Sequence, residues 1–114
     1  MVAIVQKVEP ATKVEYSLMP LCPGARAIIL AKFPVQIGRQ LDVDIRLDDI
    51  FVSRRHCEIV AAESSLVVHD LGSKNGTFVN GIRTELSRLM PNDVLNVGRM
   101  EFVVRCRPAI AQSL

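Results

Sequence analysis

Two Asn-Gly pairs, close together in one polar segment, constrain this chain more than any other feature of its sequence. Asn75-Gly76 and Asn80-Gly81 both lie within residues 70–81, which also contain a serine, a lysine and a threonine. Asn and Gly adopt positive φ at low cost, so each pair predicts a tight turn. We interpret Asn80-Gly81 as a plain hairpin turn. Around Asn75-Gly76, polar groups are denser than a turn requires, which favours a binding role.

Short apolar runs recur along the whole chain and are broken by Gly, Pro and Asn-Gly. This pattern is typical of an all-β sandwich or barrel. In the last expected strand, Phe102, Val104 and Cys106 alternate with Glu101, Val103 and Arg105, which is the period of two expected for a strand. Residues 84–90 are the one stretch that could form a helical turn, which Pro91 would end. The strands that we expect are 13–19, 26–32, 35–37, 56–62, 65–70, 77–79, 82–84, 93–97 and 100–106.

The length of 114 residues and the hydrophobic content of 49% predict one folded domain with a real core. We expect residues 1–24 to form an N-terminal strand segment that belongs to the sandwich, residues 25–107 to form the domain core, and residues 108–114 to form an exit tail. The longest apolar run, 27–31, is too short to cross a membrane. Residues 1–5 are apolar but lack a basic leader, so we expect no secretory signal.

Several functional classes are disfavoured by composition. A net charge of +2, an aromatic content of 4% and the lack of Trp argue against a nucleic-acid-binding surface. Three cysteines without close pairing indicate reduced thiols and a cytoplasmic protein. His56 and Cys57 are adjacent in an expected strand and point to opposite faces, so they do not suit a nucleophile and base pair. We expect no catalytic site, cofactor or membrane contact.

A cluster of acidic residues also needs an interpretation. The spacing of these residues does not match a calcium-binding loop, and we interpret them as a solvated acidic loop without a metal. They are Asp42, Asp44, Asp48 and Asp49.

Basic and hydrogen-bonding side chains gather in three segments at strand ends, 37–39, 52–56 and 73–77. If these loops meet at one end of a sandwich, arginines, a lysine, a hydroxyl and a carboxamide surround one point. A guanidinium group matches a phosphate in a bidentate manner. A serine adds a neutral hydrogen bond, and an asparagine both donates and accepts along a peptide backbone.

Taken in order, these motifs resemble the forkhead-associated (FHA) domain family over residues 25–106. That family has Gly-Arg, Ser-x-x-His, Asn-Gly-Thr, Asn-Gly and Leu-x-x-Gly-Asp. The matching segments are Gly38-Arg39, Ser53 to His56, Asn75-Gly76-Thr77, Asn80-Gly81 and Leu89 to Asp93. The resemblance implies two β-sheets packed as a sandwich, whose loops at one end bind phosphothreonine peptides. Asn92 replaces the glycine of the last motif, and we expect the turn to survive because Asn tolerates the left-handed region.

The resemblance assigns five residues to phosphopeptide binding. Arg39 and Ser53 are implied as the main phosphate ligands, and Arg54 as a further phosphate donor. Lys74 is implied to approach the phosphate or the methyl group of the phosphothreonine. Asn75 is implied to hold the main chain of the bound peptide.

Other residues are expected to support that site or to stand apart from it. The supporting residues are Gly38, which allows a close approach, and His56, which braces the loops, together with Gly76, Thr77 and Asn80. Arg55 points away from Arg54 and is expected to be solvated or a weak contributor. The remaining arginines considered, Arg46, Arg83, Arg88, Arg99 and Arg105, are interpreted as exposed charges.

The sequence therefore predicts a module of signalling or assembly that binds a phosphothreonine-containing protein, expected to be a substrate of a Ser/Thr kinase. The alternative is a phospho-independent interaction or scaffold domain on the same fold, because a fold does not fix a function.

Overall fold

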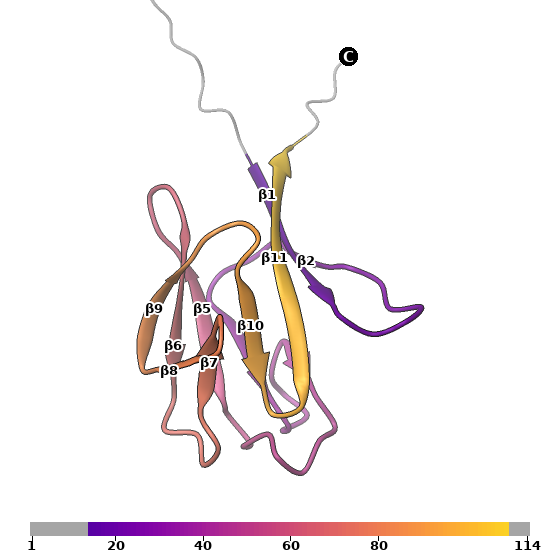
Figure 1. Ribbon diagram of the computed structural model, residues 1–114, viewed down its shortest axis with the longest axis vertical. Helices are drawn as coiled ribbons and strands as arrows, with labels where there is room; N and C mark the ends of the chain where they lie inside the picture. The colour runs from indigo at the N-terminus through magenta and orange to yellow at the C-terminus, as the bar shows by residue number, and fades with distance from the viewer. Residues whose placement is uncertain (1–13, 110–114) are drawn as a thin grey trace, which may run out of the picture.

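The protein consists of two β-sheets packed face to face, as the prediction of an all-β sandwich required (Figure 1). The computed structural model describes residues 14–109. Expectations for Lys13, for the rest of residues 1–13 and for residues 110–114 lie outside the described residues. Within residues 14–109, no helix is long and apolar enough to span a bilayer.

The first sheet has six strands and the second has five. In spatial order, the six-stranded sheet contains β2 (Ile28–Leu30), β1 (Val14–Pro20), β11 (Met100–Pro108), β10 (Val94–Val97), β7 (Thr77–Val79) and β8 (Ile82–Thr84). The five-stranded sheet contains β4 (Ile45–Arg46), β3 (Val35–Gly38), β5 (Cys57–Ala61), β6 (Leu66–Asp70) and β9 (Leu86–Leu89). Strands β3 and β4 pair in parallel, whereas β1 pairs with β11 in antiparallel register from Val14–Pro108 to Pro20–Phe102.

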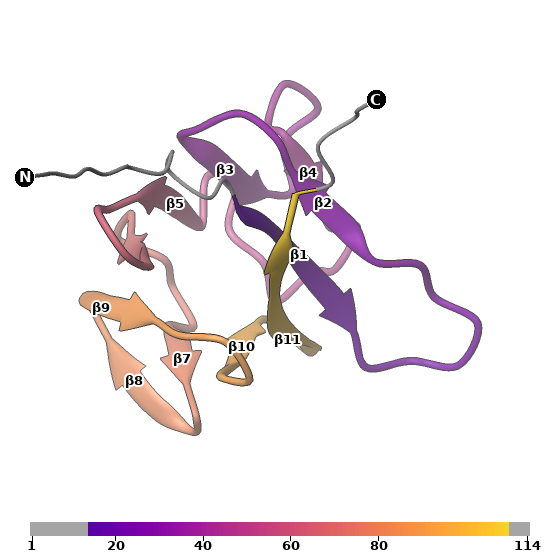
Figure 2. The same ribbon diagram turned by 90° about the horizontal axis from the view of Figure 1, so that it is seen from above.

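The core lies between the sheets because alternate residues of each strand point inward. On β11, Phe102 and Val104 are fully buried, while Glu101 and Arg105 are exposed, which confirms the period of two. Viewed from above, β3 and β5 lie across the core from β1 and β11 (Figure 2). The fully buried apolar side chains include Leu18, Ile37, Ile59, Leu66, Val68, Leu89, Leu95 and Val97.

The expected helical turn in residues 84–90 is wrong. Residues Leu86–Leu89 form strand β9, which pairs with β6 from Leu66–Leu89 to His69–Leu86. Leu89 is fully buried, so burial of this side chain and the pairing with β6 outweigh the local pattern. The two-residue strand β4 was not expected, because its length gives no periodic signal.

Two of the tight turns form as the sequence indicates. Asn80 and Gly81 have φ values of 52° and 83°, so both central residues of the β7–β8 hairpin are in the left-handed region. Asn92 has a φ value of 77°, which confirms that this turn survives without glycine. The turn is closed by Asp93, whose carboxylate accepts the N–H of Met90 at 2.8 Å.

Several of the segments that connect the strands gather at one end of the sandwich. Residues 39–56, residues 71–76 and the β10–β11 turn lie at the lower end in Figure 1. The outer ends of β1 and β11 lie at the opposite end of the molecule. The three segments that carry the predicted site are therefore at one end of the fold.

Replacement of Phe102 by Ala tests this assignment of faces. Phe102 is 0% exposed, so its truncation leaves a cavity and we expect a loss of about 3–5 kcal/mol in the free energy of unfolding. Urea unfolding followed by circular dichroism measures this loss. The matched control is Val103→Ala on the outer face of the same strand, for which we expect less than about 1.5 kcal/mol. Similar losses in both variants would contradict the assignment.

Candidate functional site

Side chains of two separate loops meet at the lower end of the sandwich. The hydroxyl of Ser53 accepts the backbone N–H of Lys74 at 3.0 Å. The carboxamide of Asn75 donates to the carbonyl of Phe51 at 2.9 Å. Segments 39–56 and 71–76, which we call the loop cluster, are therefore held together by side chains that the sequence analysis assigned to the site.

Arg39 is attached to the same loop by its backbone and by its side chain. Its N–H donates to the carbonyls of Ser53 at 3.0 Å and Arg54 at 3.1 Å. Its Nε donates to the carbonyl of Val52 at 3.0 Å. Among residues 14–109, no protein acceptor engages the terminal nitrogens of Arg39 or the side chain of Arg54. Both guanidinium groups are therefore available to an anion.

Gly38 allows β3 to pass directly beneath this loop. A Cβ atom at residue 38 would lie 2.0 Å from the carbonyl oxygen of Arg54, and that oxygen belongs to rigid backbone. The same carbonyl accepts hydrogen bonds from Arg39 and Gln40. A larger residue at position 38 would therefore displace the loop that carries Arg39 and Arg54.

His56 braces the two loops from inside the protein, where it is fully buried. Its Nδ1 accepts the N–H of Ser53 at 3.0 Å, so the ring proton is assigned to Nε2. Nε2 then donates to the carbonyl of Gly76 at 2.8 Å. The carbonyl of His56 also accepts the N–H of Leu71. One residue thus fixes Ser53 relative to the loop that follows β6.

Asp70 organises loop 71–76, a role that was missed from the sequence. One carboxylate oxygen accepts the hydroxyls of Ser73 at 2.6 Å and Thr77 at 2.7 Å, and the other accepts the N–H groups of Gly72 and Ser73. Burial is the largest influence and acts to raise the pKa of Asp70, but these hydrogen bonds together outweigh it and lower this pKa. The signal available in the sequence was an aspartate directly before Leu-Gly-Ser, which favours a side-chain-capped turn.

Asp49 is not part of a solvated acidic loop, since its side chain is 9% exposed. Its carboxylate accepts the N–H groups of Phe51 and Arg99, each at 2.9 Å. The hydrogen bond from Phe51, followed by that from Arg99, lowers the pKa of Asp49. Arg99 also lies 3.2 Å from this carboxylate and 4.8 Å from the centre of the Phe51 ring, so it is not merely an exposed charge.

Asn80 and Arg55 lie apart from this cluster of loops. Asn80, at the other end of β7, accepts the N–H of Val94 at 2.9 Å and donates to Asp93 at 3.1 Å. These bonds support the sandwich rather than the loops that carry Ser53 and Lys74. Arg55 bonds Asp42 at 2.7 Å and Gln36 at 2.6 Å, so its guanidinium group already has acceptors.

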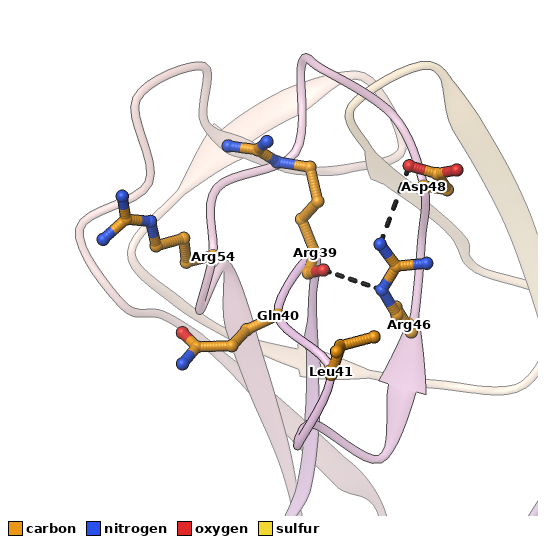
Figure 3. Close-up of a pocket in the computed structure, with 6 residues that line it drawn as sticks. All are labelled: Arg39, Gln40, Leu41, Arg46, Asp48 and Arg54. Atoms are coloured by element: carbon orange, nitrogen blue, oxygen red, sulfur yellow. Dashed lines mark hydrogen bonds and ion pairs between the residues drawn. The ribbon is translucent and has the colours of Figure 1, made fainter.

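A pocket of about 350 Å³ opens beside the cluster (Figure 3). Three guanidinium groups and one carboxylate lie around it, which gives a local excess of positive charge. This arrangement can accept a phosphate through several charge-assisted hydrogen bonds. The residues that line it are Arg39, Gln40, Leu41, Arg46, Asp48 and Arg54.

The chain is similar to several known proteins. The chain is 39% identical over 88 residues to an oxoglutarate dehydrogenase inhibitor of Corynebacterium efficiens, an alignment that covers 76% of this chain. It is 39% identical over 100 residues to the glycogen accumulation regulator GarA of Mycobacterium tuberculosis, with 77% of this chain covered. The matched regions span 62% of the length of each of these relatives.

A solved structure and a family model complete the comparison. The structure comes from a structural and functional analysis of phosphothreonine-dependent FHA domain interactions. It has a TM-score of 0.77 and 35% sequence identity to this chain. The alignment covers 83% of this chain and 99% of that one. The family model for the FHA domain matches residues 35–98, which include β3, both loops of the cluster and β10. The chain therefore belongs to the FHA domain family.

Proposed function

We propose that this domain is a non-enzymatic module that binds peptides containing phosphothreonine. In this proposal Arg39, Ser53, Arg54 and Lys74 contact the phosphate, and Asn75 holds the main chain of the peptide. The observation that carries the proposal is the contact of Ser53 with Lys74, joined to the bond from the Arg39 N–H to the Ser53 carbonyl. These contacts bring three distant segments to one point.

The chemistry of this point suits a phosphorylated side chain. A phosphothreonine carries nearly two negative charges and three acceptor oxygens. Within the described part of the chain, the terminal nitrogens of Arg39 and the guanidinium group of Arg54 have no protein acceptor, and Lys74 is exposed. Because the loops are already held by His56 and Asp70, little further ordering is needed when a ligand binds.

The comparisons support the same ligand. The solved structure with 35% identity is that of an FHA domain with phosphothreonine-dependent interactions. The inhibitor and the regulator found among the relatives are, by name, proteins that control other activities. We propose that the partner of this chain is a protein phosphorylated on threonine by a Ser/Thr kinase, and that both act in the cytoplasm.

The candidates for a catalytic group are occupied by structural roles. His56 uses both ring nitrogens to bridge Ser53 and Gly76. Burial raises the pKa of the Cys57 thiol to about 12, so at neutral pH this thiol is protonated and a poor nucleophile. Both observations support a binding role rather than a catalytic one.

Replacement of Arg39 by Ala tests the phosphate assignment. We expect a loss of about 2–5 kcal/mol in binding free energy, because the phosphate loses a charged partner. For Ser53→Ala we expect about 1–2 kcal/mol, because the serine contributes a neutral hydrogen bond. Isothermal titration calorimetry with one phosphothreonine peptide measures both values.

The control for these variants is Arg88→Ala, which removes an exposed arginine of β9 outside the cluster. We expect its affinity to match that of the wild type. Unphosphorylated peptide should not bind any of the proteins. Equal binding of phosphorylated and unphosphorylated peptide would contradict the proposal and favour a phospho-independent scaffold domain.

Replacement of Asp70 by Asn tests the support of loop 71–76. Folding lowers the pKa of Asp70 below its ordinary value of 3.8. The ionised carboxylate therefore stabilises the fold fully at pH values above 3.8. This contribution is lost as the pH falls through the lowered pKa. We therefore expect Asp70→Asn to be less stable than the wild type at pH 7, with a difference that shrinks below about pH 4. Urea unfolding from pH 7 to pH 3 measures it, and a difference that stays constant would oppose this role.

A further inference from the structure

The pocket together with Lys74 of the second loop carries four cationic side chains against one carboxylate, which is more positive charge than one phosphothreonine requires. We propose that Arg46 forms a subsite for a second anionic side chain of the bound peptide, adjacent to the phosphothreonine. The ligand class is then a peptide with a phosphothreonine and a nearby acidic group, either a carboxylate or a second phosphate. This inference rests on the proposed function and makes its substrate class narrower.

The position of Arg46 follows from the short strand β4. Residue Gly38 of β3 pairs in parallel with Arg46, so this arginine lies beside the start of the loop that carries Arg39. Ile45, its neighbour on β4, is buried, and the alternation of a strand places Arg46 on the outside. Figure 3 shows Arg39 between Arg54 on one side and Arg46 on the other. Arg46 therefore flanks the proposed phosphate ligands.

The guanidinium group of Arg46 is oriented before any ligand binds. Its Nε donates to the carbonyl oxygen of Arg39 at 2.9 Å, which anchors the side chain of Arg46 to the backbone of the loop that carries Arg39. The Nε bond leaves the terminal nitrogens for another acceptor. A planar guanidinium group held in this way is well suited to a carboxylate or a phosphate.

The present partner of these nitrogens is weak. Nη2 of Arg46 lies 3.8 Å from a carboxylate oxygen of Asp48, beyond hydrogen-bond length. The side chains of Arg46 and Asp48 are 41% and 83% exposed, and exposed ion pairs of this kind contribute little to stability. An acidic side chain of a ligand can therefore replace Asp48 at low cost.

The charges around the pocket leave Arg46 in excess. Arg39 and Arg54, with Lys74 from the second loop, already compensate a phosphate of nearly two negative charges. Asp48 is the one carboxylate among the six residues that line the pocket. A second anion would bring the charge of the occupied site close to neutral, which favours a ligand with two acidic groups over a ligand with one.

The test compares matched peptides by fluorescence anisotropy. One peptide has a phosphothreonine among neutral neighbours. Each peptide of a second set has a single Glu at one of the two positions before or the two positions after the phosphothreonine. Each peptide of a third set has a second phosphothreonine at one of these four positions. At one or more of these positions we expect the wild type to bind the doubly acidic peptide about fivefold to tenfold more tightly. Tighter binding of a Glu peptide indicates a general acidic subsite. Tighter binding of a doubly phosphorylated peptide, without tighter binding of any Glu peptide, indicates a doubly phosphorylated ligand.

Two variants attribute this gain to the subsite. In Arg46→Gln the ratio of the two affinities should fall to about one. In Asp48→Asn the ratio should rise, because the competing carboxylate is absent. The matched control Arg88→Gln should keep the ratio of the wild type.

Other results would overturn the inference. One is that the wild type binds the doubly acidic peptides no more tightly than the singly phosphorylated peptide. Another is that Arg46→Gln leaves the ratio of the two affinities unchanged. A third is that Arg46→Gln loses the same affinity for both peptides, which would place Arg46 on the phosphothreonine itself. In each case the wild type still binds the singly phosphorylated peptide, so the proposed function stands. If the wild type binds no phosphopeptide, the proposed function fails and this inference fails with it.

Discussion

The buried imidazole of His56 is the contact on which the geometry of the site depends. It accepts the N–H of Ser53 and donates to the carbonyl of Gly76, and so links the loop that follows β3 to the loop that follows β6. The bond to Gly76 is buried and the bond from Ser53 is partly buried, and a buried backbone group without a partner costs about 1–3 kcal/mol. Loss of the imidazole would therefore release two loops at once and separate Ser53 from Lys74.

Two carboxylates hold the rest of the loop structure. Asp70 satisfies the backbone and hydroxyl groups of loop 71–76, and Asp49 joins the loop before Ser53 to the β10–β11 turn. Loop backbone that lies near the core needs such partners because it has no strand neighbour to bond. The lowered pKa values of both groups reflect these bonds. The carboxylates of Asp49 and Asp70 therefore hold the loops in the conformation that exposes their basic side chains.

Parts of the site were accessible from the sequence, and others were not. The motifs around Arg39, Ser53 and Asn75 have short, ordered patterns, and the structure brings their loops together. Asp49 was misread because the other aspartates near it in the sequence are exposed, and because its contact with Arg99, fifty residues away, cannot be read from the local sequence. Strand β9 was misread as a helical turn because its pairing with β6 is a long-range contact.

The class of fold and its turns could be read from the sequence, because strand alternation and Asn-Gly turns are local properties of the chain. The φ values of Asn80 and Asn92 and the burial pattern of β11 follow from these local rules. The positions of other polar residues relative to the candidate site became visible only in the folded molecule. Tertiary packing separated Asn80 from the loop cluster and placed Arg46 beside Arg39 through the pairing of β3 with β4. Such neighbours depend on how sheets and loops pack, and spacing along the chain carries no record of that.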